Sequence, residues 1–149
     1  QDLLRQPFAQ HELTAGGKYP TGAEAVAWWQ MRLCDLPAAL AGTHLDGKSV
    51  RFNLTLTDPI AELLDDSAPW RGLSGEYVVT LGEESAARPG YDPALPTLTA
   101  TVNAFTRLWL GVRPATGLAT TDRLAGPEDL LEALDRLLCL PRPRPDWDM

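Results

Sequence analysis

The side chains best suited to chemistry in this sequence are two cysteines, two histidines and several pairs of acidic residues. Cys34 and Cys139 lie far apart, and neither His11 nor His44 stands near a cysteine or at a ligand spacing from the other. Structural zinc sites use about four such ligands at short spacings, so the sequence predicts no metal site. Two distant cysteines among apolar residues are typical of buried free thiols in a reducing cytoplasm, with a lone disulfide as the alternative.

The acidic pairs offer a second kind of chemistry. Asp65-Asp66 and Glu83-Glu84 would attract a cationic substrate such as an aminoglycoside if they lined a cleft, and charges on solvated loops are the alternative. Glu128 and Glu132 stand one helical turn apart, as a general acid and base would. On an amphipathic helix the same spacing is typical of the solvent-facing side. The sequence contains no nucleophile elbow and no assembled Ser/His/Asp set.

Composition excludes several classes of protein. The chain has 149 residues and a net charge of −7, and its 13 basic residues are scattered. Nucleic-acid binding rests on clustered basic residues, so no such partner is expected. No apolar run approaches the roughly 20 residues that span a bilayer. The first residues, Gln1 to Arg5, show no basic region followed by an apolar stretch, so we expect no signal peptide. Because the chain begins with Gln1, we expect either a removed start or a piece of a longer protein.

Strands are predicted wherever apolar and polar residues alternate. This pattern occurs near residues 26–33, 50–57, 75–82 and 97–102, and residues 83–93 have the composition of an acidic hairpin loop. In the second strand, four side chains should face the core, namely Val50, Phe52, Leu54 and Leu56. The four between them should face solvent, namely Arg51, Asn53, Thr55 and Thr57.

Helices are predicted where the apolar period changes to that of a helix. The expected ranges are 37–41, capped by Asp35, then 102–112, capped by Asn103, and a last helix with Pro127 in its first turn. Consecutive strands with short connections favour an antiparallel meander. The predicted fold is therefore α+β, a two-layer sandwich with a mostly antiparallel sheet and helices on one face. Residues 1–25 would form a linker or N-terminal arm, and residues 26–149 one domain.

Five stretches carry a family resemblance. Residues 28–40 resemble the pattern W-x-R-L-x-D-x-P-A-A-L, residues 54–59 resemble L-x-V-x-D-P, and residues 70–81 resemble W-x-x-G-x-Y-x-L. Residues 98–111 resemble L-x-x-D-V-x-x-L-x-x-L-Y-L-G, and residues 134–147 resemble a leucine-rich helix followed by R-x-P-P-W. In this order, the set resembles the sterol-carrier-protein domain at the C-terminus of GNAT acetyltransferases of the enhanced-intracellular-survival type.

The resemblance implies a bacterial cytoplasmic protein with a curved sheet, helices over one face and an apolar cavity between them. Acetyl-CoA would bind GNAT domains upstream, because this chain lacks the GNAT pyrophosphate loop; it would hold no cofactor and would be no enzyme alone. In the family the terminal carboxylate acts as a base at the upstream acetyl-transfer site. That role would fall to Met149, although the family often ends in Phe.

A stand-alone module that binds a fatty acyl chain or another apolar ligand is the alternative function, and oligomerisation a third. Such a ligand would contact apolar side chains from three predicted elements, and the proline-rich tail would be anchored by an aromatic ring. The candidates are Phe52, Tyr77, Phe105, Leu108, Trp109 and Trp147. Simple core packing is the alternative for the first five. Trp147 would either pin the tail to this domain or hold the carboxylate at a neighbouring site.

Overall fold

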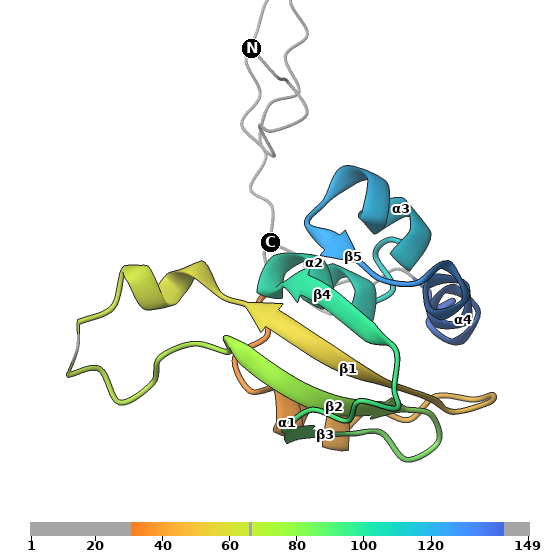
Figure 1. Ribbon diagram of the computed structural model, residues 1–149, viewed down its shortest axis with the longest axis horizontal. Helices are drawn as coiled ribbons and strands as arrows, with labels where there is room; N and C mark the ends of the chain where they lie inside the picture. Colours follow the sequence, from red (N-terminus) through yellow and green to blue (C-terminus); the bar gives the residue numbers. More distant parts are fainter. Residues whose placement is uncertain (1–30, 66, 142–149) are drawn as a thin grey trace, which may run out of the picture. The chain divides into compact units, whose positions relative to one another are not determined.

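Strand β1 (Val50–Thr57) is the central strand of a five-stranded sheet in the computed structural model of the chain, which describes residues 31–65 and 67–141 (Figure 1). The others are β2 (Gly75–Leu81), β3 (Ala86–Pro89), β4 (Thr97–Thr101) and β5 (Leu124–Ala125). Their order across the sheet is β3-β2-β1-β4-β5. β1 with β2, β2 with β3 and β4 with β5 are antiparallel, whereas β1 and β4 are parallel.

Helices cover one side of this sheet. They are α1 (Leu36–Ala41), α2 (Val102–Trp109), α3 (Ala115–Thr121) and α4 (Glu128–Leu137), with a 3-10 turn, η2, at Pro59–Glu62. Leucines of α1 and α4 and the apolar residues of α2 are buried in one cluster with Phe52, Leu54 and Leu56 of β1. These three β1 side chains share a face because a strand's side chains alternate. The predicted α+β two-layer fold is therefore confirmed.

The helix ends follow from local hydrogen bonding. The side chain of Asp35 accepts a hydrogen bond of 3.0 Å from the backbone N–H of Ala38 and caps α1, as predicted. The predicted cap of α2, Asn103, is wrong by two positions. Thr101, not the exposed Asn103, accepts from the N–H of Ala104. Pro127 precedes α4 as its N-cap rather than lying in its first turn.

The predicted antiparallel meander is wrong at one crossing. After β2 the chain forms β3, an edge strand inside the stretch expected to be a hairpin loop, and then crosses to pair β4 in parallel with β1. The short strand β5, which has no alternating pattern long enough to predict, then pairs with β4. Parallel neighbours require such a crossover, and residues 90–96 provide it.

Asn53 explains how this crossover is held. Its Nδ2 donates to the carbonyl oxygens of Asp92 (2.8 Å) and Leu95 (3.1 Å), and its Oδ1 accepts from the N–H of Asp92 (2.9 Å). The residue is 1% exposed, so its predicted solvent-facing position is wrong. A buried amide is stable here because all of these polar atoms are hydrogen-bonded.

Two further predictions change. Cys34 and Cys139 are free thiols, but both are exposed rather than buried. Residues 31–33 are not a strand, although Leu33 is buried. The rest of that predicted strand and the predicted arm at residues 1–25 lie outside the described residues, and the chain divides into units of residues 1–31 and 32–149. None of the described helices has both the length and the apolar character to cross a bilayer.

Candidate functional site

The predicted ligand-contacting side chains meet in the core between the sheet and the helices. Phe52, Phe105 and Leu108 are no more than 1% exposed and belong to one cluster. Tyr77 and Trp109 are partly buried and pack against that cluster. Strand β1 supplies Phe52, β2 supplies Tyr77, and one face of α2 supplies the other three. All five side chains are therefore part of the apolar core, which the sequence analysis gave as the alternative to a ligand role.

The polar ends of the two partly buried aromatics are hydrogen-bonded. The hydroxyl of Tyr77 donates to the carbonyl of Leu73 (3.1 Å), and the Nε1–H of Trp109 donates to Oγ1 of Thr43 (2.9 Å). Burial raises the pKa of Tyr77 above its usual value, and the negative charges of Asp35 and Asp58 raise it further. Both rings thus occupy fixed positions. An apolar ligand in this core would displace packed side chains, and the ligand role of the five residues stays a prediction.

Trp147 and Met149, the predicted anchor and terminal carboxylate, lie outside the described residues. The segment before them approaches the end of α2 closely. A Cβ at Gly111, whose φ is +65°, would lie 2.7 Å from the Cβ of Leu140. Only glycine fits this position, because it tolerates both the positive φ and the contact. The last part of the chain that the structure describes, at Leu140, therefore lies beside the C-terminal end of α2.

A second polar cluster, which the sequence did not indicate, surrounds Asp58 at the end of β1. One guanidinium nitrogen of Arg32 contacts both carboxylate oxygens, at 2.5 and 2.6 Å. The backbone N–H groups of Leu73 (2.9 Å) and Ile60 (3.1 Å) donate to the same carboxylate. A Cβ at Gly72 would lie 2.6 Å from Asp58 Oδ2. The carboxylate is thus enclosed by donors and needs a glycine beside it.

The ionisation of Asp58 follows from this environment. Burial by itself raises the pKa of Asp58, but the hydrogen bonds from Arg32, Ile60 and Leu73 and the charge of Arg32 outweigh it, so the pKa is lowered. The guanidinium of Arg32 also lies 5.8 Å from the ring centroid of Trp70, whose Nε1–H donates to the Cys34 carbonyl (3.2 Å). Residues 58–74, which connect β1 to β2, are called the 58–74 arm below. These contacts attach both ends of this arm to the segment before α1.

Asp58 was visible in the sequence as the Asp-Pro that ends a strand. That signal predicts a turn or a helix cap, and Asp58 does cap η2. The signal contains nothing about Arg32, which is 26 residues earlier. The arrangement can hold a charge in place, and the hydroxyl of Ser74 beside it is hydrogen-bonded to the backbone N–H and carbonyl of Asp58 (2.7 and 3.3 Å).

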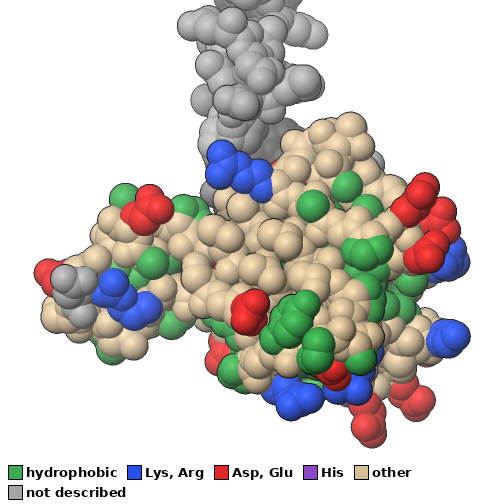
Figure 2. All heavy atoms as spheres, in the orientation of Figure 1, with side chains coloured by type: hydrophobic (Ala, Val, Ile, Leu, Met, Phe, Trp, Pro, Cys, Tyr) green, Lys and Arg blue, Asp and Glu red, His purple; other side chains and the backbone are tan. Residues whose placement is uncertain are grey.

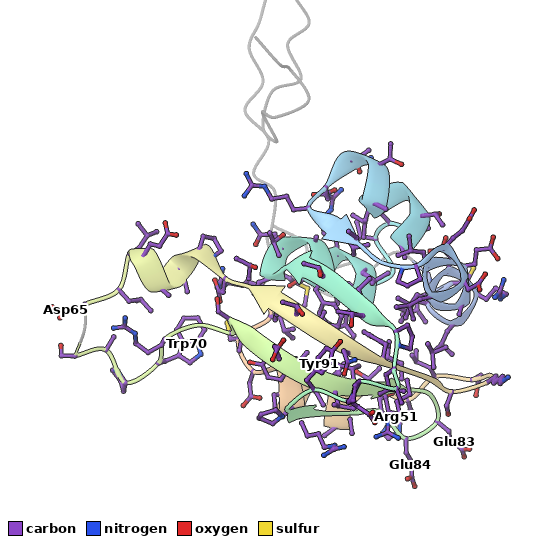
Figure 3. The ribbon with its side chains drawn as sticks, viewed as in Figure 1. Arg51, Asp65, Trp70, Glu83, Glu84 and Tyr91 are labelled. Atoms are coloured by element: carbon purple, nitrogen blue, oxygen red, sulfur yellow. The ribbon has the colours of Figure 1, made fainter. Side chains whose placement is uncertain are left out.

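The acidic pairs do not form one cationic-substrate cleft. Asp65 lies at the tip of the 58–74 arm, and Glu83 and Glu84 lie at the opposite end of the sheet (Figure 3). Acidic side chains on this face are dispersed over several separate places (Figure 2). Glu128 and Glu132 are exposed on α4. The exposure of the five described residues favours the solvated-charge interpretation, and Asp66 lies outside the described residues.

His44 and the other described side chains that could ligate a metal ion do not gather at one place. His44 is exposed, and its Nδ1 is 2.9 Å from the carbonyl of Glu83. Within residues 31–65 and 67–141, no three His, Cys, Asp or Glu side chains gather closely enough to hold a metal ion. His11 lies outside the described residues.

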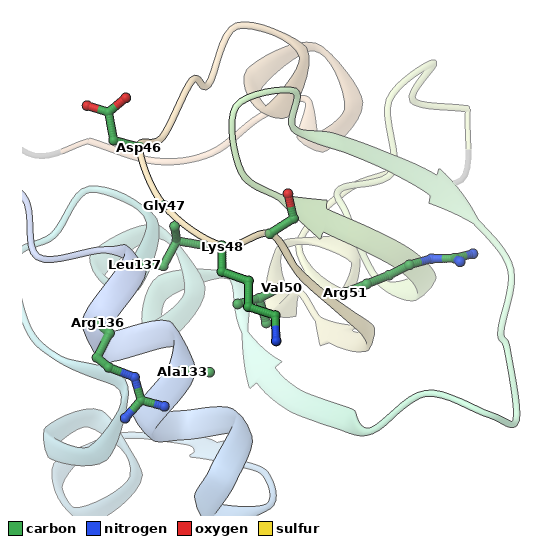
Figure 4. Close-up of a pocket in the computed structure, with 9 residues that line it drawn as sticks. Asp46, Gly47, Lys48, Val50, Arg51, Ala133, Arg136 and Leu137 are labelled. Atoms are coloured by element: carbon green, nitrogen blue, oxygen red, sulfur yellow. The ribbon is translucent and has the colours of Figure 1, made fainter.

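A hollow of about 520 Å³ lies between helix α4 and the segment that leads into β1 (Figure 4). It is lined by Asp46, Gly47, Lys48, Ser49, Val50, Arg51, Ala133, Arg136 and Leu137. Of the predicted ligand-contacting residues, none of the five that the structure describes lines it. No sequence motif marks the hollow, because its two walls are more than 80 residues apart along the chain.

The fold and these sites are those of an α+β domain with apolar packing between its layers. A family model for the sterol carrier protein domain matches residues 36–145. Because this match covers most of the chain, the protein belongs to the sterol carrier protein domain family. No curated protein matches the chain.

Solved structures with a similar fold include three bacterial chains. A GCN5-related N-acetyltransferase from Kribbella flavida has a TM-score of 0.59 at 23% identity, over 75% of this chain and 26% of that one. A GCN5-related N-acetyltransferase from Anabaena variabilis ATCC 29413 has a TM-score of 0.57 at 16% identity, with the same coverage. A probable N-acyltransferase from Enterococcus faecalis V583 has a TM-score of 0.51 at 24% identity, over 71% and 25%. This chain therefore spans about a quarter of their length.

Proposed function

We propose that this domain is the C-terminal part of a bacterial, cytoplasmic GNAT-type N-acetyltransferase of the enhanced-intracellular-survival type. On this proposal the upstream GNAT domains bind acetyl-CoA and carry the transfer chemistry, and this domain completes their site with the carboxylate of Met149. The observation that carries the proposal is the sterol-carrier match over residues 36–145. It is supported by similar folds in three chains described as acetyltransferases or a probable acyltransferase.

The course of the chain is consistent with this role. Leu140, near the end of the described residues, lies against Gly111 beside α2. Three of the next five residues are prolines, Pro141, Pro143 and Pro145. Proline favours extended backbone, so a segment of this composition is suited to carrying a terminal group away from its own domain. Trp147 would anchor the segment.

The test is to extend the C-terminus of the enzyme that contains this domain. Appending Gly-Ser-Gly after Met149 moves the carboxylate and should reduce acetyl transfer by about 100-fold or more, the usual contribution of a general base. The matched control, Met149→Phe, keeps the terminal carboxylate and should retain activity. Equal activity of the extended and unextended enzymes would eliminate the carboxylate role.

An apolar-ligand module is the second candidate function. It is favoured by the gathering of Phe52, Tyr77, Phe105, Leu108 and Trp109 in one apolar cluster. The test is displacement of a fluorescent fatty acid, together with mass spectrometry of the native protein. A bound acyl chain and loss of displacement in Phe105→Ala, with Phe105→Leu as the packing control, would support it. Absence of both a co-purifying ligand and micromolar displacement would contradict it.

A further inference from the structure

The hollow beside α4 exists because its walls are built from small residues. Gly47 and Ser49 lie on the segment before β1, and Ala133 lies opposite them on α4. Gly47 has a φ of +122°, which side chains rarely adopt. Residues 133, 136 and 137 follow the i, i+3, i+4 spacing that places side chains on one helix face. A volume of about 520 Å³ is within the usual range for small-molecule sites.

The segment that forms one wall is held at both ends. The N–H of Leu45 donates to the carbonyl of Gly82 (2.9 Å), and Leu45 itself is buried. Ser49 fits closely against Gly82, where an added Cβ would lie 2.4 Å from its hydroxyl oxygen. Val50 then enters the sheet opposite Leu81. Lys48 is therefore presented from a backbone that is already ordered, which reduces the entropic cost of binding.

Two cations flank the opening of the hollow. In Figure 4 the side chains of Lys48 and Arg136 extend along its two sides, whereas Asp46 and Arg51 point away from it. Within the part of the chain that the structure describes, Lys48 has no ion-pair partner. This arrangement stands out in a chain whose net charge is −7.

The neighbouring carboxylates do not cancel these charges. Arg136 lies 3.4 Å from Glu132, and both side chains are more than half exposed. Arg51 lies 3.7 Å from Asp92 on the side away from the hollow. Exposed pairs of this kind contribute little and exchange readily with other partners. Arg136 can therefore turn its guanidinium to a bound anion without a large cost.

We propose that this hollow binds a small organic anion. Its oxyanion group, a carboxylate or a phosphate, would lie between Lys48 Nζ and the guanidinium of Arg136. Its short aliphatic part would lie against Val50, Ala133 and Leu137, which line the space between them. The site is separate from the predicted acyl-ligand residues and does not depend on acetyl transfer.

The experiment is a titration of the isotope-labelled chain, followed by amide chemical shifts, with four probes: octanoate, octyl phosphate, 1-octanol and inorganic phosphate. Both amphiphilic anions should shift the amides of Gly47, Ser49 and Ala133. They should bind at least about tenfold more tightly than either 1-octanol or inorganic phosphate, because each of those lacks one half of the recognition. The tighter of the two anions identifies the head group. Equal binding of 1-octanol, or shifts confined to Phe52 and Phe105, would overturn the proposal.

Variants test the charges and the hollow separately. Lys48→Gln and Arg136→Gln should each weaken octanoate binding by about fivefold, which is typical of one exposed charge contact. Ala133→Leu keeps both charges and a good helix former but fills the space, so it should abolish the shifts. Arg113→Gln, an exposed arginine outside the hollow, is the matched control. If both charge variants keep wild-type affinity with unchanged folded spectra, the proposal is wrong.

Discussion

The two sides of strand β1 are held in different ways. On the helix side, Phe52, Leu54 and Leu56 are buried in one cluster with apolar side chains of four helices. On the other side, Asn53 is hydrogen-bonded to the 90–96 crossover. At the end of the strand, Asp58 is bonded to Arg32 and to the backbone of Leu73 at the base of the 58–74 arm. Apolar packing is distributed over many contacts, whereas each polar contact depends on one side chain with fixed partners.

Because of this difference, substitutions on the two sides of β1 should lower the free energy of unfolding for different reasons. A change on the helix side removes dispersion contacts and leaves a cavity. A change on the polar side leaves buried hydrogen-bonding groups without partners. Three substitutions compare these costs directly, all measured as the free energy of unfolding from urea denaturation.

Phe52→Ala should have the largest effect. The side chain is fully buried at the centre of the core, and loss of a buried Phe costs about 3–5 kcal/mol. Phe52→Leu is the matched control and should cost less, about 1.5 kcal/mol, because leucine refills most of the space that alanine would leave empty. If the two variants were equally stable, the core around Phe52 would not be close-packed.

Asp58→Asn should have the second-largest effect and lower the free energy of unfolding by about 2 kcal/mol. It removes a charge that Arg32 and two backbone N–H groups stabilise. The exposed Asp65→Asn on the same arm is the control and should change stability by less than about 0.5 kcal/mol. A loss of equal size in both variants would show that the ring of donors around Asp58 does not stabilise the fold.

The same pair gives a pH dependence. The pKa of Asp58 is lowered in the folded chain, so its stabilisation is present above the unfolded value of about 3.9. It is lost as the pH falls through the folded pKa. Unfolding free energies at pH 7 and pH 3 should therefore converge more in Asp58→Asn than in the unsubstituted chain. An identical acid dependence in the two proteins would contradict the assignment.

Asn53→Ala should have the smallest effect, about 1–2 kcal/mol, because it leaves the crossover carbonyls of Asp92 and Leu95 without their donor. Hydrogen exchange of the Asp92 amide, which donates to Asn53, should become faster. Thr55→Ala, a half-buried neighbour on the same side of β1, is the control and should leave that exchange rate unchanged. Unaltered exchange in Asn53→Ala would mean that other contacts hold the crossover.

The sequence by itself determined the elements that depend on near neighbours. The alternation from Val50 to Leu56 predicted β1 and its buried face, and the leucine spacing of α4 predicted its contact side. Asp35 was identified as a cap because its partner, Ala38, is three residues away. Periodicity and capping are local, so a single sequence carries them. The grouping of Phe52 with Phe105 followed from the same apolar faces.

Only the tertiary structure decided the features that join distant segments. The parallel pairing of β1 with β4, the bond from Asn53 to Asp92 and the enclosure of Asp58 by Arg32 each link residues at least 26 positions apart. The hollow between Lys48 and Arg136 likewise has walls from opposite ends of the domain. Local patterns contain no information about which polar groups will meet across such distances. These contacts are set by how the layers pack, which buries some polar residues and brings the partners that satisfy them.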